Sequence, residues 1–172
     1  MSYFVLNQDA RFANAVRPLG VMDAVRPEMM SPDHAHQLAA VNLHFKVAEA
    51  TKVDYVDFIE HPVPFVSDRL KRVLEKFTPD TQFFAGAFTD LKRKHQEVYW
   101  LAVPPQIECL SEESEFGLDG SLRRLVIDDT RTGGSMFLQV GGLRERILLI
   151  HLALAEGLLR RDFNGIRLTR VR

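Results

Sequence analysis

Residues 65–88, FVSDRLKRVLEKFTPDTQFFAGAF, decide the fold, because this stretch predicts a capped helix, a stop and a strand. Ser67 suits the N-cap, since its hydroxyl can accept a hydrogen bond from a free amide of the first turn. Thr78-Pro79-Asp80 ends the helix because proline cannot continue it, and residues 82–88 predict a strand. Five apolar residues recur at helical spacing and form one stripe: Val66, Leu70, Val73, Leu74 and Phe77.

This apolar stripe must pack against another part of the protein, most simply a sheet. Burying one such side chain contributes roughly 1.5–3 kcal/mol, whereas ordering each residue of the helix costs about 1–2 kcal/mol. A second apolar helical stripe runs through residues 143–161. We therefore expect an α+β fold, in which two main helices, at about 67–77 and 143–161, cover a mostly antiparallel sheet. The expected strands are residues 3–6, 42–48, 82–88, 98–103, 106–110, 122–127, 136–140 and 166–171.

The N-terminal part of the chain has little periodicity. Pro18, Pro27 and Pro32 punctuate it, and Gly20 lies between the first two. Loops of this length are uncommon in compact domains and are often functional. We expect one domain over residues 1–172, with a long irregular surface excursion at about 7–40 and a short helix near its end.

Composition narrows the class of protein. The chain has 172 residues, of which 46% are apolar, and its formal net charge is -1. Such a chain suits one domain and has no overall charge that would attract nucleic acid or an acidic membrane. Its single cysteine cannot form an internal disulfide, and its N-terminus lacks the pattern of a secretory signal. We expect a cytoplasmic protein that binds neither nucleic acid nor membrane.

The sequence Asp33-His34-Ala35-His36 is a candidate metal site. Two imidazoles and a carboxylate can bind zinc, but a real site needs three or four ligands. Only His44 lies near enough in the sequence to complete it, and residues two apart on a helix face different directions. The pattern favours an exposed polar turn over a metal site.

Catalytic residues are also not indicated. Cys109 has acidic neighbours, which oppose the thiolate form that a nucleophile needs. Ser67, Asp68 and His61 do not predict a triad, because adjacent serine and aspartate cannot adopt the relay geometry. His151, in an apolar segment, is more typical of a core histidine with satisfied hydrogen bonds. We expect no catalytic residue, no metal, no cofactor and no enzyme activity.

Charge is distributed unevenly along the chain. Residues 108–129 include seven acids and two bases, whereas residues 141–172 include seven bases and three acids. An acidic loop can steer a basic protein partner, although solvated loops without partners also carry such residues. The candidate partner-binding residues are the acids of the first segment: Glu108, Glu112, Glu113, Glu115 and Asp119.

The order of segments resembles a family of bacterial polymorphic-toxin immunity proteins, the immunity protein eleven type. The resemblance covers about residues 43–171. It is carried by the helix start VSDRL at 66–70, by Tyr99 in an aromatic strand, and by IECLSEES at 107–114. Phe137 and Gly165-Ile166 occupy the places of two further family features.

The resemblance implies a non-enzymatic cytoplasmic protein that binds and neutralises a cognate toxin, often a nuclease, by covering its active site. The resemblance assigns no functional role to any particular residue of this chain. Two alternatives remain open: a protein-interaction module without an immunity role, and an enzyme or small-ligand-binding protein with the excursion folded over a pocket. The sequence also leaves homo-oligomerisation open.

Overall fold

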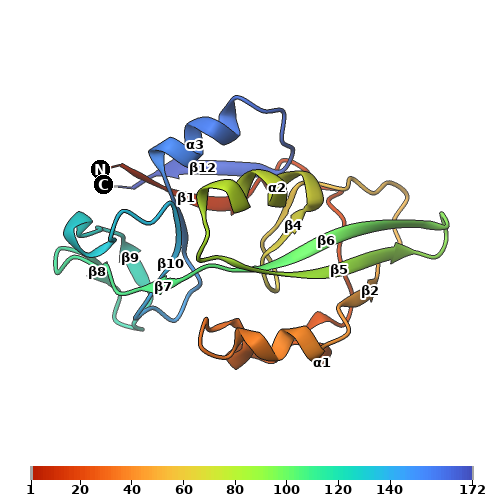
Figure 1. The fold of residues 1–172 in the computed structure, drawn as a ribbon, viewed down its shortest axis with the longest axis horizontal. Helices are drawn as coiled ribbons and strands as arrows, with labels where there is room; N and C mark the ends of the chain where they lie inside the picture. The colour runs from red at the N-terminus through yellow and green to blue at the C-terminus, as the bar shows by residue number, and fades with distance from the viewer. Residues whose placement is uncertain (1, 172) are drawn as a thin grey trace.

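The computed structural model describes residues 2–171 and shows an α+β protein built on two five-stranded sheets (Figure 1). Neighbouring strands are antiparallel except for one parallel pair in each sheet. In the first sheet the strands lie in the order β12 (Ile166–Arg170), β1 (Tyr3–Gln8), β11 (Leu148–His151), β10 (Phe137–Val140) and β7 (Gln106–Ile107). In the second sheet the order is β2 (His44–Lys46), β5 (Gln82–Asp90), β6 (His95–Val103), β4 (Phe65–Ser67) and β3 (Phe58–Ile59).

The remaining elements lie around these sheets. Strands β8 (Glu115–Phe116) and β9 (Leu122–Arg124) form a separate two-stranded hairpin. The α+β class and the mostly antiparallel pairing are confirmed, but the strands form two sheets where one was expected. The helices are α1 (Val21–Ala24), α2 (Asp68–Phe77) and α3 (Leu152–Leu159), with 3-10 helices η1 (Pro27–Met30), η2 (Ala35–Ala40) and η3 (Asp129–Arg131).

Helix α2 forms where the sequence predicts it. The Ser67 hydroxyl accepts a hydrogen bond of 3.1 Å from the Leu70 amide, which caps the first turn. The apolar stripe is buried through Leu70, Val73 and Leu74. At the other end, the Thr78 hydroxyl donates to the Leu74 carbonyl at 2.7 Å and satisfies one carbonyl of the last turn. The predicted helix at about 67–77 is therefore confirmed.

The second predicted helix, residues 143–161, is wrong over its first half. Leu148–His151 is strand β11, which pairs with β1 on one side and β10 on the other. Only Leu152–Leu159 is helical. A strand buried on both faces is apolar at every position, so its sequence cannot be distinguished from a buried helix by periodicity.

The expected surface excursion at about 7–40 is also corrected. Its apolar side chains are buried against one face of the second sheet, where they share a core with Phe65, Phe88 and Tyr99. Figure 1 shows this orange segment lying along that sheet, with α2 on the other face. The excursion is a covering layer made of α1 and two 3-10 helices. Its buried apolar residues are Val16, Val21, Val25, Met29, Met30, Ala35 and Leu38.

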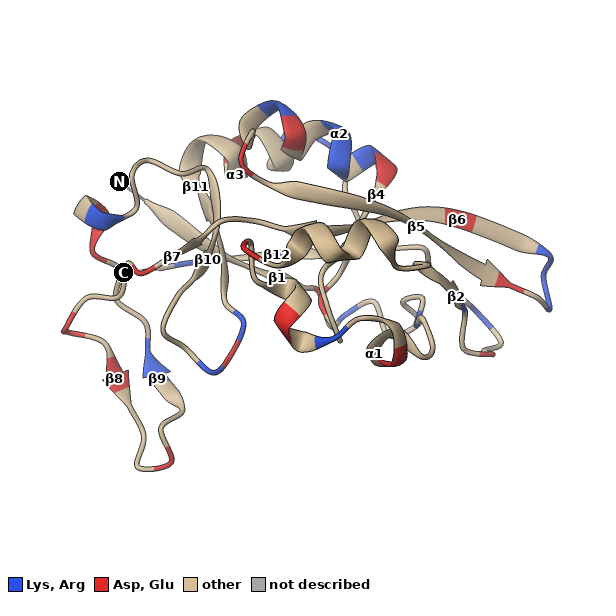
Figure 2. Cartoon of the chain, turned by 60° about the horizontal axis from the view of Figure 1, so that its bottom comes forward, with Lys and Arg blue, Asp and Glu red and all other residues tan. Residues whose placement is uncertain are grey.

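Two hairpins extend from opposite ends of the molecule (Figure 2). The β5–β6 hairpin carries Lys92, Arg93 and Lys94 at its turn. The β8–β9 hairpin lies at the other end and carries several acidic residues. Within residues 2–171, no helix combines the length and the apolar character that crossing a bilayer requires.

Candidate functional site

The predicted partner-binding residues lie on or beside the β8–β9 hairpin. We name residues 111–127, which include both strands, the acidic hairpin. Glu112 and Glu113 lie in its first turn, Glu115 begins β8, and Asp119 lies in the tip between the strands. Glu108 precedes the hairpin, just after β7. All five side chains are exposed, and four of them share the hairpin.

The acidic character of this hairpin is weaker than the sequence count suggests. Arg124 on β9 lies 3.6 Å from the Glu115 carboxylate on β8. Asp119 keeps its charge readily, because hydrogen bonds from the hydroxyl and amide of Ser121 lower the pKa of its carboxyl group. The strands therefore carry a mixed charge. Among residues 2–171 the structure gives no ion pair for Glu112, Glu113 or Asp119, and the Asp119 carboxylate accepts hydrogen bonds from Ser121.

The hairpin also exposes two large apolar side chains that the sequence analysis missed. Phe116 is 49% exposed on β8, and Leu118 at the tip is fully exposed. The available signal was FGL at 116–118, an apolar group between acidic residues in a segment predicted to be a loop. The Leu118 side chain and about half of the Phe116 side chain are therefore accessible to another molecule.

The hairpin is held in place by the loop that precedes β11. The Arg144 guanidinium donates to the Asp119 carbonyl, and the Glu145 carboxylate accepts a hydrogen bond of 2.9 Å from the Leu122 amide. This hydrogen bond lowers the pKa of the Glu145 carboxyl group. At the base, Ser114 and Val126 exchange two hydrogen bonds of 2.9 and 3.0 Å. These contacts fix the position of the tip.

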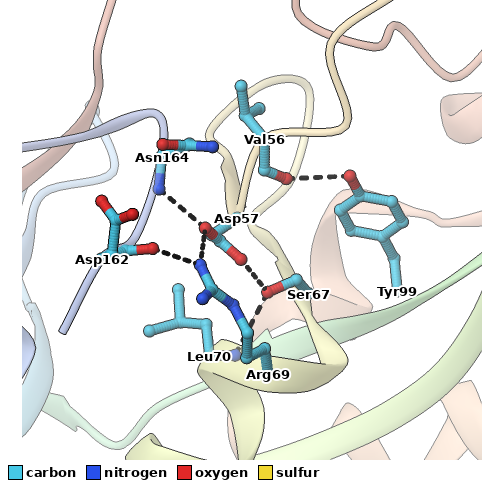
Figure 3. A network of polar contacts seen from close by, with 8 residues as sticks. All are labelled: Val56, Asp57, Ser67, Arg69, Leu70, Tyr99, Asp162 and Asn164. Atoms are coloured by element: carbon cyan, nitrogen blue, oxygen red, sulfur yellow. Dashed lines mark hydrogen bonds and ion pairs between the residues drawn. The ribbon is translucent and has the colours of Figure 1, made fainter.

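A second polar cluster surrounds the buried carboxylate of Asp57 (Figure 3). It accepts hydrogen bonds from the Ser67 hydroxyl at 2.6 Å, from the Arg69 guanidinium at 2.9 Å and from the Asn164 amide at 2.7 Å. Arg69 also donates to the carbonyl of Asp162. Because Ser67 lies at the start of α2 and Asn164 precedes β12, Asp57 joins segments that are far apart in the sequence.

The Asp57 cluster borders an open groove of about 640 Å³. The Ser67 hydroxyl donates to Asp57 and accepts from the Leu70 amide at the helix cap, so it takes part in two contacts that hold the fold together. On the other wall, the Tyr55 hydroxyl is buried without a hydrogen-bond partner in the described part of the chain. Burial raises the pKa of this phenol, so it stays neutral. The arrangement is suited to stabilising the fold.

The histidines of the candidate metal site do not lie together in the structure. His34, His36 and His44 are all exposed, the first two around the start of η2 and the third in β2. Within residues 2–171, no three or more His, Cys, Asp or Glu side chains are grouped so that they could hold a metal ion. His61 is exposed and lies 3.6 Å from Glu60, apart from the Ser67–Asp57 hydrogen bond.

Cys109 and His151 both take part in packing or hydrogen bonding within the fold. Cys109 is fully buried, and burial raises the pKa of its thiol, which disfavours the reactive thiolate. His151 caps α3, because its ring nitrogen Nδ1 accepts from the Ala153 amide at 3.1 Å. The same ring packs edge-to-face on Tyr3, with centroids 5.4 Å apart. His151 has a hydrogen-bond partner as expected, but it is partly exposed and lies at a strand–helix junction, not on a buried helix.

No protein-family model, no curated protein and no solved structure matches this chain.

Proposed function

We propose that this protein is a non-enzymatic immunity protein, which binds a bacterial toxin in the cytoplasm and covers the toxin's active surface. The observation that carries the proposal is the acidic hairpin, which extends from the body and exposes Phe116 and Leu118 among carboxylates. The resemblance of residues 43–171 to toxin-immunity proteins supports the same function.

Tight protein complexes obtain most of their binding energy from a few anchoring side chains. Leu118, which makes little contact with its own protein, is available as such an anchor, and Phe116 lies beside it in the sequence. The acidic residues around them would increase the association rate with a basic surface. A nucleic-acid-cleaving toxin presents such a basic surface, because it must bind phosphates.

Preorganisation of the hairpin favours binding. The Arg144 and Glu145 contacts hold the tip before any partner arrives. A loop that is already ordered loses less conformational entropy on association than a mobile one. The two-stranded hairpin alone would be marginally stable, so these contacts from the neighbouring loop are what make the tip a fixed surface.

Co-expression with candidate toxins, chosen from genes found next to the gene of this protein, tests the proposal. We expect the protein to restore growth and to co-purify with the toxin. A variant carrying Phe116→Ser and Leu118→Ser should fold normally and lose both effects. Leu91→Ser is the matched control, since Leu91 is also an exposed leucine at a hairpin turn but lies at the opposite end of the molecule.

The outcomes separate the candidate functions. Growth rescue that depends on Phe116 and Leu118 supports occlusion by the acidic hairpin. Binding of the toxin without growth rescue would favour an interaction module with no immunity role. Neither binding nor rescue by the folded protein would refute the proposal.

A further inference from the structure

Arg146 is a partly buried cation without a carboxylate partner. It lies in the loop before β11, where its guanidinium donates one hydrogen bond, from Nη1 to the Pro62 carbonyl at 3.1 Å. Its Nε atom is buried and has no partner within residues 2–171. No carboxylate of these described residues lies within 4.0 Å of its nitrogen atoms, although its neighbours include Glu60 and Glu145.

Both neighbouring carboxylates are engaged elsewhere. Glu60 accepts hydrogen bonds from the Gln8 amide at 2.8 Å and from the Asn7 side chain at 3.1 and 3.3 Å. Glu145 accepts from the Leu122 amide in the acidic hairpin. Neither forms an ion pair with Arg146 within 4.0 Å, although the charge of Glu60 acts on it from a longer distance, and the guanidinium keeps hydrogen-bonding capacity that residues 2–171 do not use.

Arg146 is one of the residues that line a cavity of about 430 Å³. The cavity lies between β1, the turn at residues 60–62 and the loop before β11. Part of its wall is apolar, and part carries hydrogen-bonding groups. Besides Arg146 and the two carboxylates, the lining side chains include Leu6, Asn7, His61, Arg144, Ile147 and Leu148.

Burial of an unpaired charge is energetically unfavourable, so buried charges in proteins are normally paired. Burial lowers the pKa of Arg146, but a guanidinium stays protonated near neutral pH even so. A planar anion would satisfy it best, because a carboxylate matches the geometry of the guanidinium nitrogens.

We propose that this cavity is a binding site for a small organic carboxylate, whose carboxylate group accepts hydrogen bonds from Arg146 and whose apolar part packs on Ile147 and Leu148. The apolar wall favours an organic acid over inorganic phosphate. The cavity shares Arg144 and Glu145 with the loop that holds the acidic hairpin, but its binding of a small acid can be measured without any toxin, so the proposal does not depend on the function proposed above.

Calorimetric titration of the full chain with phenylacetate tests the site, with phenylacetamide as the uncharged analogue. We expect phenylacetate to bind and phenylacetamide to bind on the order of tenfold more weakly or not at all, because charge-assisted hydrogen bonds to Arg146 are lost. Arg146→Gln should weaken phenylacetate binding on the order of tenfold or more. Arg160→Gln, which removes an exposed arginine outside the cavity lining, should leave it unchanged.

Arg146→Lys keeps the charge and provides a second variant if the glutamine variant folds poorly. It should bind more weakly than the parent protein, because an ammonium group lacks the planar fork of donors. The parent protein is also titrated with inorganic phosphate, and its affinity for phosphate is compared with its affinity for phenylacetate. Four results would each overturn the proposal. The parent protein could bind phenylacetate and phenylacetamide equally, bind phosphate more tightly, or bind no phenylacetate although it is folded. The Arg146 variants could also bind phenylacetate as tightly as the parent protein.

Discussion

The Ser67 hydroxyl donates a hydrogen bond of 2.6 Å to the Asp57 carboxylate and accepts one of 3.1 Å from the Leu70 amide. One side chain thus caps α2 and connects the helix to the segment before β3. Asp57 extends the connection to β12, because its own amide donates to the Asn164 carbonyl at 2.9 Å and its carboxylate accepts from the Asn164 amide. The contacts between Asp57 and Asn164 (Figure 3) thus connect the second sheet, at β3, with the first sheet, at β12.

Asp57→Ala should therefore destabilise the protein strongly. The substitution leaves the Ser67 hydroxyl, the Arg69 guanidinium and the Asn164 amide without their acceptor. Breaking a buried ion pair by removing one partner costs about 3–5 kcal/mol, and exposure of Arg69 to solvent places this case at the lower end. Urea unfolding measures the free energy of unfolding.

Asp33→Ala is the matched control for this substitution. Asp33 is exposed and has no hydrogen bond or ion pair to residues 2–171, so its removal should change the free energy of unfolding by less than about 0.5 kcal/mol. Equal effects of the two substitutions would contradict the role assigned to Asp57.

Acid should destabilise the protein below about pH 4, near the ordinary pKa of aspartate. The side-chain and backbone hydrogen bonds from Arg11 lower the pKa of Asp9, and those from Arg93 lower the pKa of Asp90. The unfolded chain then binds protons more readily than the folded protein. The stabilising contribution is fully present above the unfolded pKa and is lost as the pH falls through the lower folded pKa.

Unfolding measured between pH 7 and pH 2.5 checks this dependence. Replacing Asp9 and Asp90 with asparagine should lower stability at pH 7 and reduce its decline in acid. Asp119, Asp128 and Glu145 also have lowered pKa values, so part of the decline should persist. A double variant with the same acid dependence as the parent protein would disagree with this assignment.

Two glycine-to-alanine substitutions should have opposite effects. In β5, a Cβ atom at Gly86 would lie 2.5 Å from the Leu43 carbonyl oxygen, so β2 would have to move, at a cost of about 1–3 kcal/mol. In α3, a Cβ atom at Gly157 would meet the Phe77 ring at an ordinary 3.6 Å. Alanine there should stabilise the helix by roughly 0.5–1 kcal/mol. Thermal unfolding of both variants tests the opposite signs.

The sequence predicted those elements whose pattern is local. Helix α2 was found because its cap, its apolar stripe and its stop all lie between Ser67 and Asp80. The strands β5 and β6 were found from their apolar runs, although their hairpin is longer than expected, since Asp90 pairs with His95. Each of these features depends on neighbouring residues, which a sequence shows directly.

Features set by tertiary contacts were not predictable in this way. Leu148–Ile150 reads equally well as helix or strand, and its pairing with β1 and β10 decides the outcome. Residues 7–40 have no regular period because one short α-helix and two 3-10 helices bury Val21, Met29 and Leu38 one at a time. At the candidate surface, the acidic residues could be named from the sequence, but the pairing of Arg124 with Glu115 required the fold.

The support of the acidic hairpin by Glu145 gives a test that separates local from global stability. Glu145→Ala removes the acceptor of the Leu122 amide, which should make this amide exchange with solvent faster. The free energy of unfolding should change by less than about 0.5 kcal/mol, because the interaction lies at the surface.

Amide exchange followed by nuclear magnetic resonance measures both quantities in one sample. Core amides such as that of Leu149 report global unfolding and should keep their protection, whereas Leu122 should lose it. Glu49→Ala, which removes an exposed glutamate outside the hairpin, is the control and should change neither. If Leu122 exchanged at the parent rate in the Glu145 variant, the tip would be fixed by the Arg144 contact and the strand pairing alone. If Leu149 lost protection too, the loop before β11 would be part of the global folding unit, and the hairpin could not be weakened without weakening the whole protein.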